Sequence, residues 1–194
     1  HTMARHENIC KCIHLPVQSG SSVVLEKMNR GYNREEYMRH IDAIRTILPG
    51  CSITTDIISG FCGESHVDHR ETLSMMEWAT YDYAYMFKYS ERPGTLAERQ
   101  YEDDVPENVK SVRLEEIIRL QNRLSLDSNK KDVGTVHKVL ADSVSKRSED
   151  HLSGRNSQNK VVVFPREQYK PADYVFVKVI DCTSATLIGD VVQS

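Results

Sequence analysis

The sequence of 194 residues has no long hydrophobic run. A membrane-spanning helix needs about 18 or more consecutive apolar residues, and no such stretch occurs. The first ten residues are polar and basic and do not have the pattern of a signal peptide. These absences exclude a spanning helix and predict a cytoplasmic protein with no membrane partner.

Cysteine motifs for metal or redox chemistry are also missing. The chain has an odd number of cysteines, five, at positions 10, 12, 51, 62 and 182. Without a secretory signal, an odd count indicates free thiols in a reducing compartment. The spacing of Cys10 and Cys12 is not C-x-x-C, and on a strand it favours packing on one face. Since no cluster-binding cysteine triplet occurs, the sequence predicts no metal site in this chain.

The net charge of −3 points to no particular class of partner. Its distribution says slightly more. Residues 1–129 hold 15 Lys and Arg against 20 Asp and Glu, whereas residues 130–194 hold 10 against 8. A mildly basic tail is compatible with nucleic acid, although a solvated surface explains it as well.

What is present is organised around Cys51–Ser65, which reads CSITTDIISGFCGES. The β-branched residues of its first half are typical of a strand buried on both faces, as in a parallel sheet. Gly60 and Gly63 predict a turn after this strand, and Ser65 with Asp68 predicts the start of a helix. Folds of the α/β class bind ligands at such strand–turn–helix junctions, because backbone N–H groups and the helix dipole converge there. The glycine pair alone is a weak signal, since turns often carry glycine for geometry.

Residues 1–129 otherwise alternate between strand and helix patterns. Further strands are predicted at Ile9–Val17 and Tyr83–Tyr89, and helices at Val23–Met28, after the capping box Asn33–Glu36, at His66–Ala79, and from Pro106 to about Ser128. The positions expected to be buried are Val67, Leu73 and Met76 in the third helix and Val109, Val112, Ile117, Leu120 and Leu124 in the fourth.

Parallel strands joined by helices place their exit loops on one edge of the sheet. The loops Gln18–Gly20, Gly60–Glu64 and Ser90–Thr95 should therefore meet there, at the edge that is catalytic in a barrel. Asp56, inside the apolar run, must be paired or must face a site. Three strands cannot close a barrel, so either the sheet is open or earlier strands lie outside this sequence.

From Lys130 the pattern changes to short β-rich runs separated by polar residues. These runs are Val133–Leu140, Val161–Phe164, Tyr174–Ile180 and Ala185–Val192, with the polar stretch Ser143–Gln158 between the first two. Alternation along Tyr174–Ile180 predicts a small, curved all-β module. The sequence thus predicts two domains, 1–129 and 130–194.

Several motifs, taken together, resemble the radical-SAM methylthiotransferases. They are HLPVQSGS at residues 14–21, MNRGY at 28–32, TTDII-x-GF-x-GE at 54–64 and YS-x-RPGT at 89–95. The first of them is similar to the branch that makes 2-methylthio-N6-isopentenyladenosine in tRNA. The tail resembles the TRAM domain of these enzymes, in Gly154-Arg155 and in Asn159–Phe164.

This resemblance implies the C-terminal part of a partial (β/α) radical-SAM barrel followed by a small all-β, OB-like TRAM barrel. It implies the cofactor S-adenosylmethionine and two 4Fe–4S clusters in the full-length protein, whose cysteine ligands are not in this sequence. It also implies tRNA and a reducing protein as partners. One departure from the family is Cys62, which replaces the usual proline of GFPGE and is read as a small-residue replacement.

The resemblance also assigns residues to the site, although it identifies no catalytic residue. Gln18 and Ser19 match the region that binds the ribose of S-adenosylmethionine. The segment whose backbone meets the adenine is matched by Ile58, Gly60, Gly63 and Glu64. Arg92 could meet a carboxylate, a phosphate or the substrate RNA, or could form a loop-fixing salt bridge.

Four basic residues of the tail are candidates for contact with tRNA: Lys146, Arg147, Arg155 and Lys160. A solvated loop explains them equally well. Three functions stay open for the chain: this tRNA methylthiotransferase, one acting on threonylcarbamoyl-adenosine in tRNA or on a ribosomal protein, and a non-catalytic RNA-binding fragment.

Overall fold

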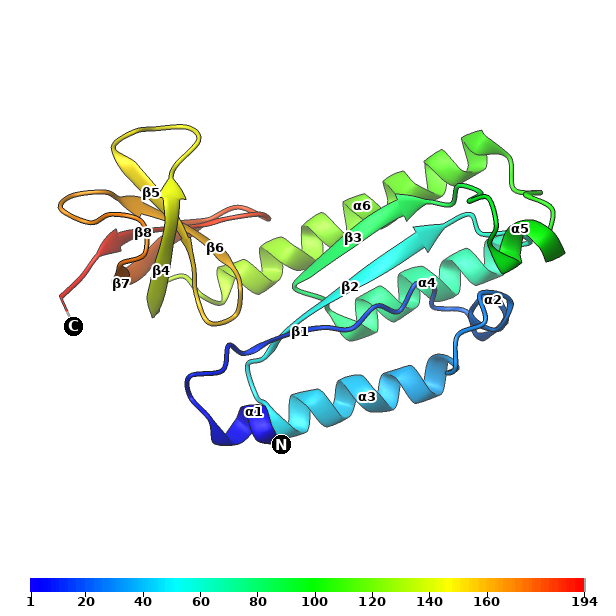
Figure 1. The fold of residues 1–194 in the computed structure, drawn as a ribbon, viewed down its shortest axis with the longest axis horizontal. Helices are drawn as coiled ribbons and strands as arrows, with labels where there is room; N and C mark the ends of the chain where they lie inside the picture. The colour runs from blue at the N-terminus through cyan, green and yellow to red at the C-terminus, as the bar shows by residue number, and fades with distance from the viewer. Residues whose placement is uncertain (194) are drawn as a thin grey trace. The chain divides into compact units, whose positions relative to one another are not determined.

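The structure, a computed structural model, describes residues 1–193 (Figure 1). These residues form two compact units. We call residues 14–49 and 53–121 the sheet unit, and residues 1–13, 50–52 and 122–193 the barrel unit. The barrel unit thus includes two short pieces from the N-terminal half of the chain. The single predicted boundary between residues 129 and 130 stays a prediction.

A three-stranded sheet has the order β1 (Cys12–His14), β2 (Ser52–Ser59) and β3 (Tyr83–Lys88). Most of it belongs to the sheet unit, whereas Cys12, Ile13 and Ser52 are assigned to the barrel unit. Strands β2 and β3 are parallel, with Thr54 opposite Tyr83 and Ser59 opposite Lys88. The helices are α2 (Ser22–Lys27), α3 (Arg34–Ile47), α4 (His66–Ala79), α5 (Leu96–Gln100) and most of α6 (Glu107–Lys130). The long helices α3, α4 and α6 run alongside the strands (Figure 1).

Both predicted helix starts are confirmed as capping boxes. The Asn33 side chain accepts from the Glu36 amide at 2.9 Å, and the Glu36 carboxylate accepts from the Asn33 amide at 2.9 Å. Ser65 and Asp68 form the same reciprocal pair at the start of α4. Each box satisfies amide donors that a helix end otherwise leaves unpaired, so α3 and α4 begin where the sequence predicts.

The expectation that β2 is buried on both faces is wrong. Its alternate residues are buried on one face and half-buried on the other. On the open face of the neighbouring β3, Tyr83, Tyr85 and Phe87 are 44%, 50% and 54% exposed. Asp56 lies on this open face with its Oδ1 3.4 Å from His14 Nε2, so the carboxylate is paired, as the sequence required.

The helices also depart from the predicted burial. Val67 in α4 and Val112 in α6 are each 56% exposed, because periodicity alone assigned them to the wrong face. The buried positions of α6 are Lys110, Arg113, Ile117, Gln121, Ser125 and Asn129. Their spacing of three or four residues is a single helix face, but a mainly polar one. The strand predicted at Ile9–Val17 is shorter, spanning Cys12–His14, and α5 was not predicted.

The barrel unit begins with the short α1 (Thr2–Arg5) and contains a closed barrel of five strands. The strands are β4 (Val136–Val144), β5 (His151–Arg155), β6 (Val161–Pro165), β7 (Tyr174–Cys182) and β8 (Leu187–Val191), in the spatial order β4-β5-β6-β8-β7. A mixed α/β fold followed by a small β-barrel is confirmed. Strand β5 was missed because it lies inside the polar stretch Ser143–Gln158.

The barrel core confirms the alternation predicted for β7. Val175, Val177 and Val179 point inward and are at most 1% exposed, together with Leu152 from β5 and Phe164 from β6. Inward valines fill the interior of a small barrel, and the intervening residues of β7 face solvent.

Candidate functional site

The candidate site lies where β2 ends and the chain turns into α4. Gly60 and Gly63 have φ angles of +76° and +70°, a backbone conformation that favours glycine. The Glu64 amide donates to the Phe61 carbonyl at 2.9 Å and closes the turn between them. Ser65 then caps α4. The two glycines singled out in the sequence are therefore required by this turn.

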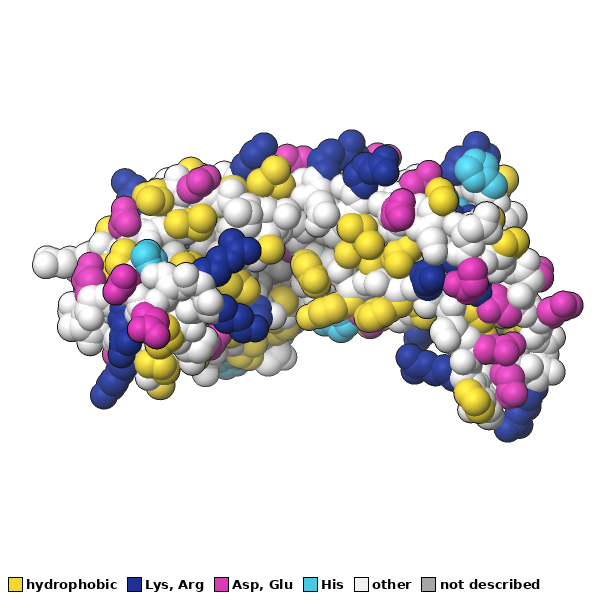
Figure 2. Space-filling view, turned by 90° about the horizontal axis from the view of Figure 1, so that it is seen from above, with side chains coloured by type: hydrophobic (Ala, Val, Ile, Leu, Met, Phe, Trp, Pro, Cys, Tyr) yellow, Lys and Arg dark blue, Asp and Glu magenta, His cyan; other side chains and the backbone are white. Residues whose placement is uncertain are grey.

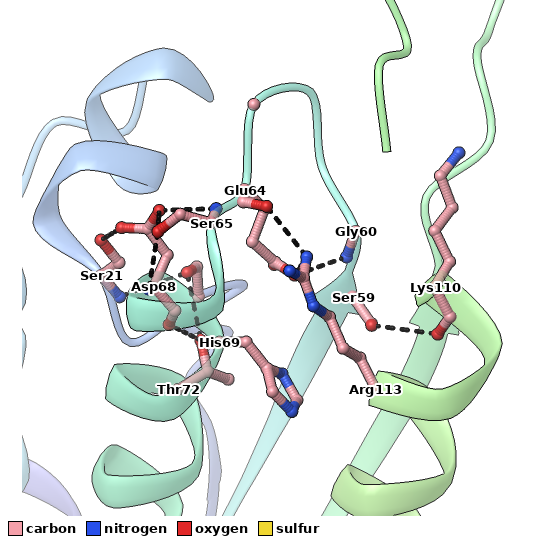
Figure 3. Close-up of polar contacts among 12 residues, drawn as sticks. Ser21, Ser59, Gly60, Glu64, Ser65, Asp68, His69, Thr72, Lys110 and Arg113 are labelled. Carbon is pink, nitrogen blue, oxygen red and sulfur yellow. Dashed lines mark hydrogen bonds and ion pairs between the residues drawn. The ribbon is translucent and has the colours of Figure 1, made fainter. Parts of the chain in front are cut away.

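Glu64 holds the turn from inside. It is 5% exposed, and its Oε1 accepts from the Gly60 amide at 3.1 Å and from Arg113 Nη1 at 2.8 Å (Figure 3). Arg113 Nη1 also donates to the Glu64 carbonyl at 2.9 Å. Burial raises the pKa of the Glu64 carboxyl, although the Arg113 guanidinium opposes the rise. A buried carboxylate with a guanidinium partner fixes the backbone on both sides of the turn.

The first turns of α6 pack against the same turn. A Cβ built on Gly60 would lie 2.3 Å from Cγ of Lys110, so the side chain of Lys110 occupies the space that a larger residue would need. Lys110 Nζ lies 2.6 Å from Asp103 and 3.1 Å from Glu107. Burial lowers the pKa of Lys110, but the hydrogen bonds to these carboxylates outweigh burial and raise it overall. A buried cation in this position is stable because it is paired.

The loop before α6 completes this support. Asp104 Oδ1 accepts from the Gly63 amide at 2.6 Å. The turn is thus held by Arg113 and Lys110 from α6 and by Asp104 from the preceding loop. The apolar pattern of α6 predicts a packing helix and does not indicate these polar contacts.

The exit of β1 meets the same edge through backbone bonds. The Gln18 amide donates to the Asp56 carbonyl, and the Ile58 amide donates to the Gln18 carbonyl, each at 2.9 Å. Gln18 has a φ of 69° and is 7% exposed. Ser19 is fully buried, with its hydroxyl 3.3 Å from that of Thr72. The structure brings Gln18 and Ile58 together, and it directs the Ser19 hydroxyl to α4.

A cavity of about 340 Å³ opens beside the turn. It is lined by Lys27, Met28, Asn29, Arg30, Ile58, Phe61, Tyr89, Thr95, Leu96 and Ala97. The rings of Phe61 and Tyr89 meet edge to face, with centroids 4.9 Å apart. A pocket of this size with apolar and aromatic walls and two cations suits a flat ring that carries an anionic group.

Of the predicted cofactor residues, Ile58 lines this cavity, whereas Gly60, Gly63 and Glu64 shape the adjacent turn. The cavity residues Phe61 and Tyr89 were missed as candidates. The sequence did contain a signal for both. Phe61 follows Gly60 after β2 and Tyr89 follows the end of β3, and the exit loops of these parallel strands are expected to meet.

Cys62 is buried beside these rings and is 2% exposed. Burial raises the pKa of its thiol. A reactive cysteine needs a lowered pKa and access to solvent, and Cys62 has neither. These properties agree with its interpretation as a small-residue replacement.

The remaining predicted residues lie apart from the cavity lining. Arg92 is exposed in the loop after β3, at the same edge of the sheet. In the barrel unit Arg147 is exposed, and Arg155 Nη1 donates to the Asn159 carbonyl at 2.8 Å. Lys160 Nζ donates to Asp132 Oδ2 at 2.7 Å and to Ser128 Oγ at 2.8 Å, so this amine is engaged within the fold.

Residues 1–193 show neither a metal site nor a membrane-spanning helix. Within this range, no group of three His, Cys, Asp or Glu side chains is arranged to hold a metal ion. Among the same residues, no helix is long and apolar enough to cross a membrane.

Comparison with known proteins gives matches over both units. Residues 130–192 match the family model described as the TRAM domain. The chain is 55% identical over 192 residues to a tRNA-2-methylthio-N(6)-dimethylallyladenosine synthase of Bacteroides fragilis, covering 99% of this chain and 42% of that protein. It is 53% identical over 188 residues to the synthase of the same name from Christiangramia forsetii, covering 97% of this chain and 39% of that protein.

Among solved structures, the chain resembles coproporphyrinogen III oxidase of Escherichia coli, a radical SAM enzyme. The TM-score is 0.51 at 18% identity, over 76% of this chain and 41% of that one. At this identity the match supports the fold alone. The resemblance read from the sequence motifs is confirmed, and the chain spans about two fifths of the length of the curated relatives it matches.

Proposed function

We propose that this chain is the C-terminal part of a cytoplasmic radical-SAM methylthiotransferase. The full protein would add a methylthio group to carbon 2 of N6-isopentenyladenosine, also called N6-dimethylallyladenosine, in tRNA. The observation that carries this proposal is the 55% identity, over 99% of the chain, to synthases named for that product. The fold and the cavity at the sheet edge support it independently.

The cavity supports S-adenosylmethionine as the cofactor. Its volume lies within the range of small-molecule sites, and its walls offer aromatic and apolar groups to a purine ring. Ile58, Phe61 and Tyr89 would hold the adenine, and Lys27 and Arg30 would neutralise the carboxylate of the ligand. When bound, this cofactor supplies the radical chemistry and the methyl group. This chain's residues would position the cofactor and exclude water from it.

The two 4Fe–4S clusters of such an enzyme need cysteine ligands. Residues 1–193 contain no group of side chains that fits a cluster. We therefore assign both clusters, and the contact with a reducing protein, to the part of the parent protein outside this sequence. The chain alone should be catalytically inactive.

Contact with tRNA is assigned to the barrel unit and to the exposed Arg92. Arg147 and Arg155 offer guanidinium groups at the surface, where they could pair with phosphates. Lys160 is the weakest of the predicted contacts, because its amine is paired with Asp132. Residues at the sheet edge would select the base, and the barrel would bind the sugar–phosphate backbone of the tRNA.

The test is mass spectrometry of tRNA nucleosides from a strain that lacks the full-length gene. We expect loss of 2-methylthio-N6-isopentenyladenosine, accumulation of the unthiolated nucleoside, and restoration by the full gene. Loss of the methylthio form of threonylcarbamoyl-adenosine instead would identify the alternative tRNA substrate. An unchanged nucleoside profile would refute a role in tRNA thiolation and favour a ribosomal protein target.

A further inference from the structure

The outer face of β4 and β7 in the barrel unit carries large apolar side chains at the surface. Val136 is 53% exposed, Tyr174 62%, Phe176 36% and Ile180 52%. Strand alternation places these residues outward because the valines between them fill the core. Figure 2 shows hydrophobic, basic and acidic side chains interspersed on the visible face of the barrel unit, at the left of the view.

Two lysines lie among these side chains. In the antiparallel register of β4 and β7, Lys138 is opposite Phe176, and Val136 is opposite Lys178. Lys138 Nζ lies 4.6 Å from the ring centroid of Tyr174, which is a cation–π contact. One carboxylate adjoins the face, since Asp190 of β8 is opposite Lys178. The face therefore combines aromatic rings with cations, and Asp190 is an anion beside it.

The two rings lie on the outer side of one strand. Tyr174 and Phe176 are two residues apart on one strand, so they share a face and are separated by roughly 7 Å. Phe164 is buried and Tyr169 packs against the core, whereas these two rings point outward. Aromatic side chains on a barrel surface, flanked by basic groups, bind unpaired nucleotides in OB-folds by base stacking.

We propose that the outer face of β4 and β7, formed by Val136, Lys138, Tyr174, Phe176, Lys178 and Ile180, binds unpaired RNA bases by stacking them on Tyr174 and Phe176. This inference rests on the proposed function, in which the partner is tRNA. Lys138 and Lys178 pair with the phosphates of the same nucleotides. An RNA duplex cannot use the rings, because its bases are already stacked and paired.

The test measures binding of the 194-residue chain to an anticodon stem–loop RNA and to a duplex of equal length. The double variant Tyr174→Thr/Phe176→Thr removes the rings and keeps β-branched residues in the strand. We expect affinity for the stem–loop to fall at least about 5-fold, the lower bound for one lost stacking contact. Affinity for the duplex and the dependence on salt should stay the same.

Three controls accompany this variant. Ile188→Thr removes an apolar side chain that is also 36% exposed but lies on β8, and it should bind as the wild type does. Tyr174→Phe/Phe176→Tyr keeps both rings and should restore the affinity. Circular dichroism of every variant should show an intact barrel. Equal weakening of stem–loop and duplex, or no weakening at all, would overturn the stacking proposal.

The same titration separates this proposal from the proposed function. If the ring variant binds normally while an Arg147→Ala/Arg155→Ala variant binds more weakly, stacking is wrong and tRNA binding stands. If the wild-type chain binds neither RNA, tRNA binding by this chain fails. Hydrogen exchange of the full-length parent without RNA gives a further check. Pairing with β4 and β8 already protects amides of β7, so the reference is the 194-residue chain. Protection of residues 174–180 in the parent beyond that reference would mean that another part of the parent covers the face, which overturns the proposal.

Discussion

Two glycines of this chain share one backbone conformation in different surroundings. Gly50 and Gly60 both have a φ of +76°. A Cβ on Gly50 would meet nothing within 4 Å, whereas a Cβ on Gly60 would lie 2.3 Å from Cγ of Lys110. Glycine is therefore needed at position 60 for the turn and for the packing of Lys110 from α6, whether or not a ligand also approaches it.

Replacing each glycine by alanine separates these demands. Gly50→Ala should cost only the left-handed backbone, about 1–2 kcal/mol of unfolding free energy. Gly60→Ala should cost a further 1–3 kcal/mol or so, because Lys110 must move. Urea denaturation of both variants measures the difference. Equal losses of unfolding free energy would show that the Lys110 side chain can move at no cost. A Lys110→Ala background should remove most of the additional cost.

Two buried carboxyls at the site should respond to pH in opposite directions. Burial raises the pKa of Glu64, so the folded state binds more protons there than the unfolded state. For Asp68, burial acts to raise the pKa, but hydrogen bonds from Ser21 and Ser65 outweigh it and lower the pKa overall. Glu64 thus contributes stability that is lost as pH rises above its usual value of 4.5, and Asp68 contributes stability that is lost as pH falls below 3.8.

The measurement is the unfolding free energy of wild type, Glu64→Gln and Asp68→Asn between pH 3 and 7. As pH rises above 4.5, the unfolding free energy of the wild type should fall relative to that of Glu64→Gln. As pH rises from 3, the unfolding free energy of the wild type should increase relative to that of Asp68→Asn. The same sign for both variants would contradict these pKa directions.

At the scale of elements, α6 and the loop before it support the turn from one side. Asp104 accepts from the Gly63 amide at 2.6 Å, and Arg113 holds both the carboxylate and the carbonyl of Glu64. The turn lies outside the regular hydrogen bonding of β2 and α4, so these side-chain contacts define its geometry together with the bond from the Glu64 amide to the Phe61 carbonyl.

Removing Asp104 tests this support directly. In Asp104→Ala the Gly63 amide loses its acceptor and should exchange with solvent at least about 10-fold faster, the equivalent of 1.4 kcal/mol. The matched control is Glu102→Ala, an exposed acid in the same loop whose loss should leave that amide unchanged. Hydrogen exchange followed by NMR measures both, and equal rates in the two variants would remove Asp104 from the support of the turn.

At the scale of the whole molecule, the proposed contact with RNA is placed in residues 130–194, which hold 10 Lys and Arg against 8 Asp and Glu. If Arg147 and Arg155 pair with phosphates, each contact adds roughly one unit to the slope of log affinity against log salt. Arg147→Ala/Arg155→Ala should therefore weaken tRNA binding and flatten that slope by up to about two units. Titrations of the full-length protein at several salt concentrations measure this.

Discrimination between modified and unmodified adenine should survive that double variant, because the sheet edge would select the base. A solvated loop that makes no RNA contact predicts coincident curves for wild type and variant. Lys160→Ala is an informative comparison, since its amine is paired with Asp132. That variant should lose stability more than it loses salt dependence.

The sequence by itself determined the features that depend on near neighbours in the chain. Capping boxes at Asn33 and Ser65, the glycine turn after β2 and the alternation of β7 are local, so a short window contains all of their causes. The motifs also determined the resemblance to methylthiotransferases, since they combine specific residues over most of the chain.

Only the tertiary structure decided which groups meet across long separations. Glu64 and Arg113 are 49 positions apart, and nothing near either residue predicts their pairing. The apolar periodicity of α6 misplaced Val112, because the face that packs on the site is polar and its cost is offset by ion pairs. The cavity beside Phe61 exists because the end of α2, the turn after β2 and the segment after β3 converge. Local propensity does not encode such convergence, since it arises only when the sheet assembles.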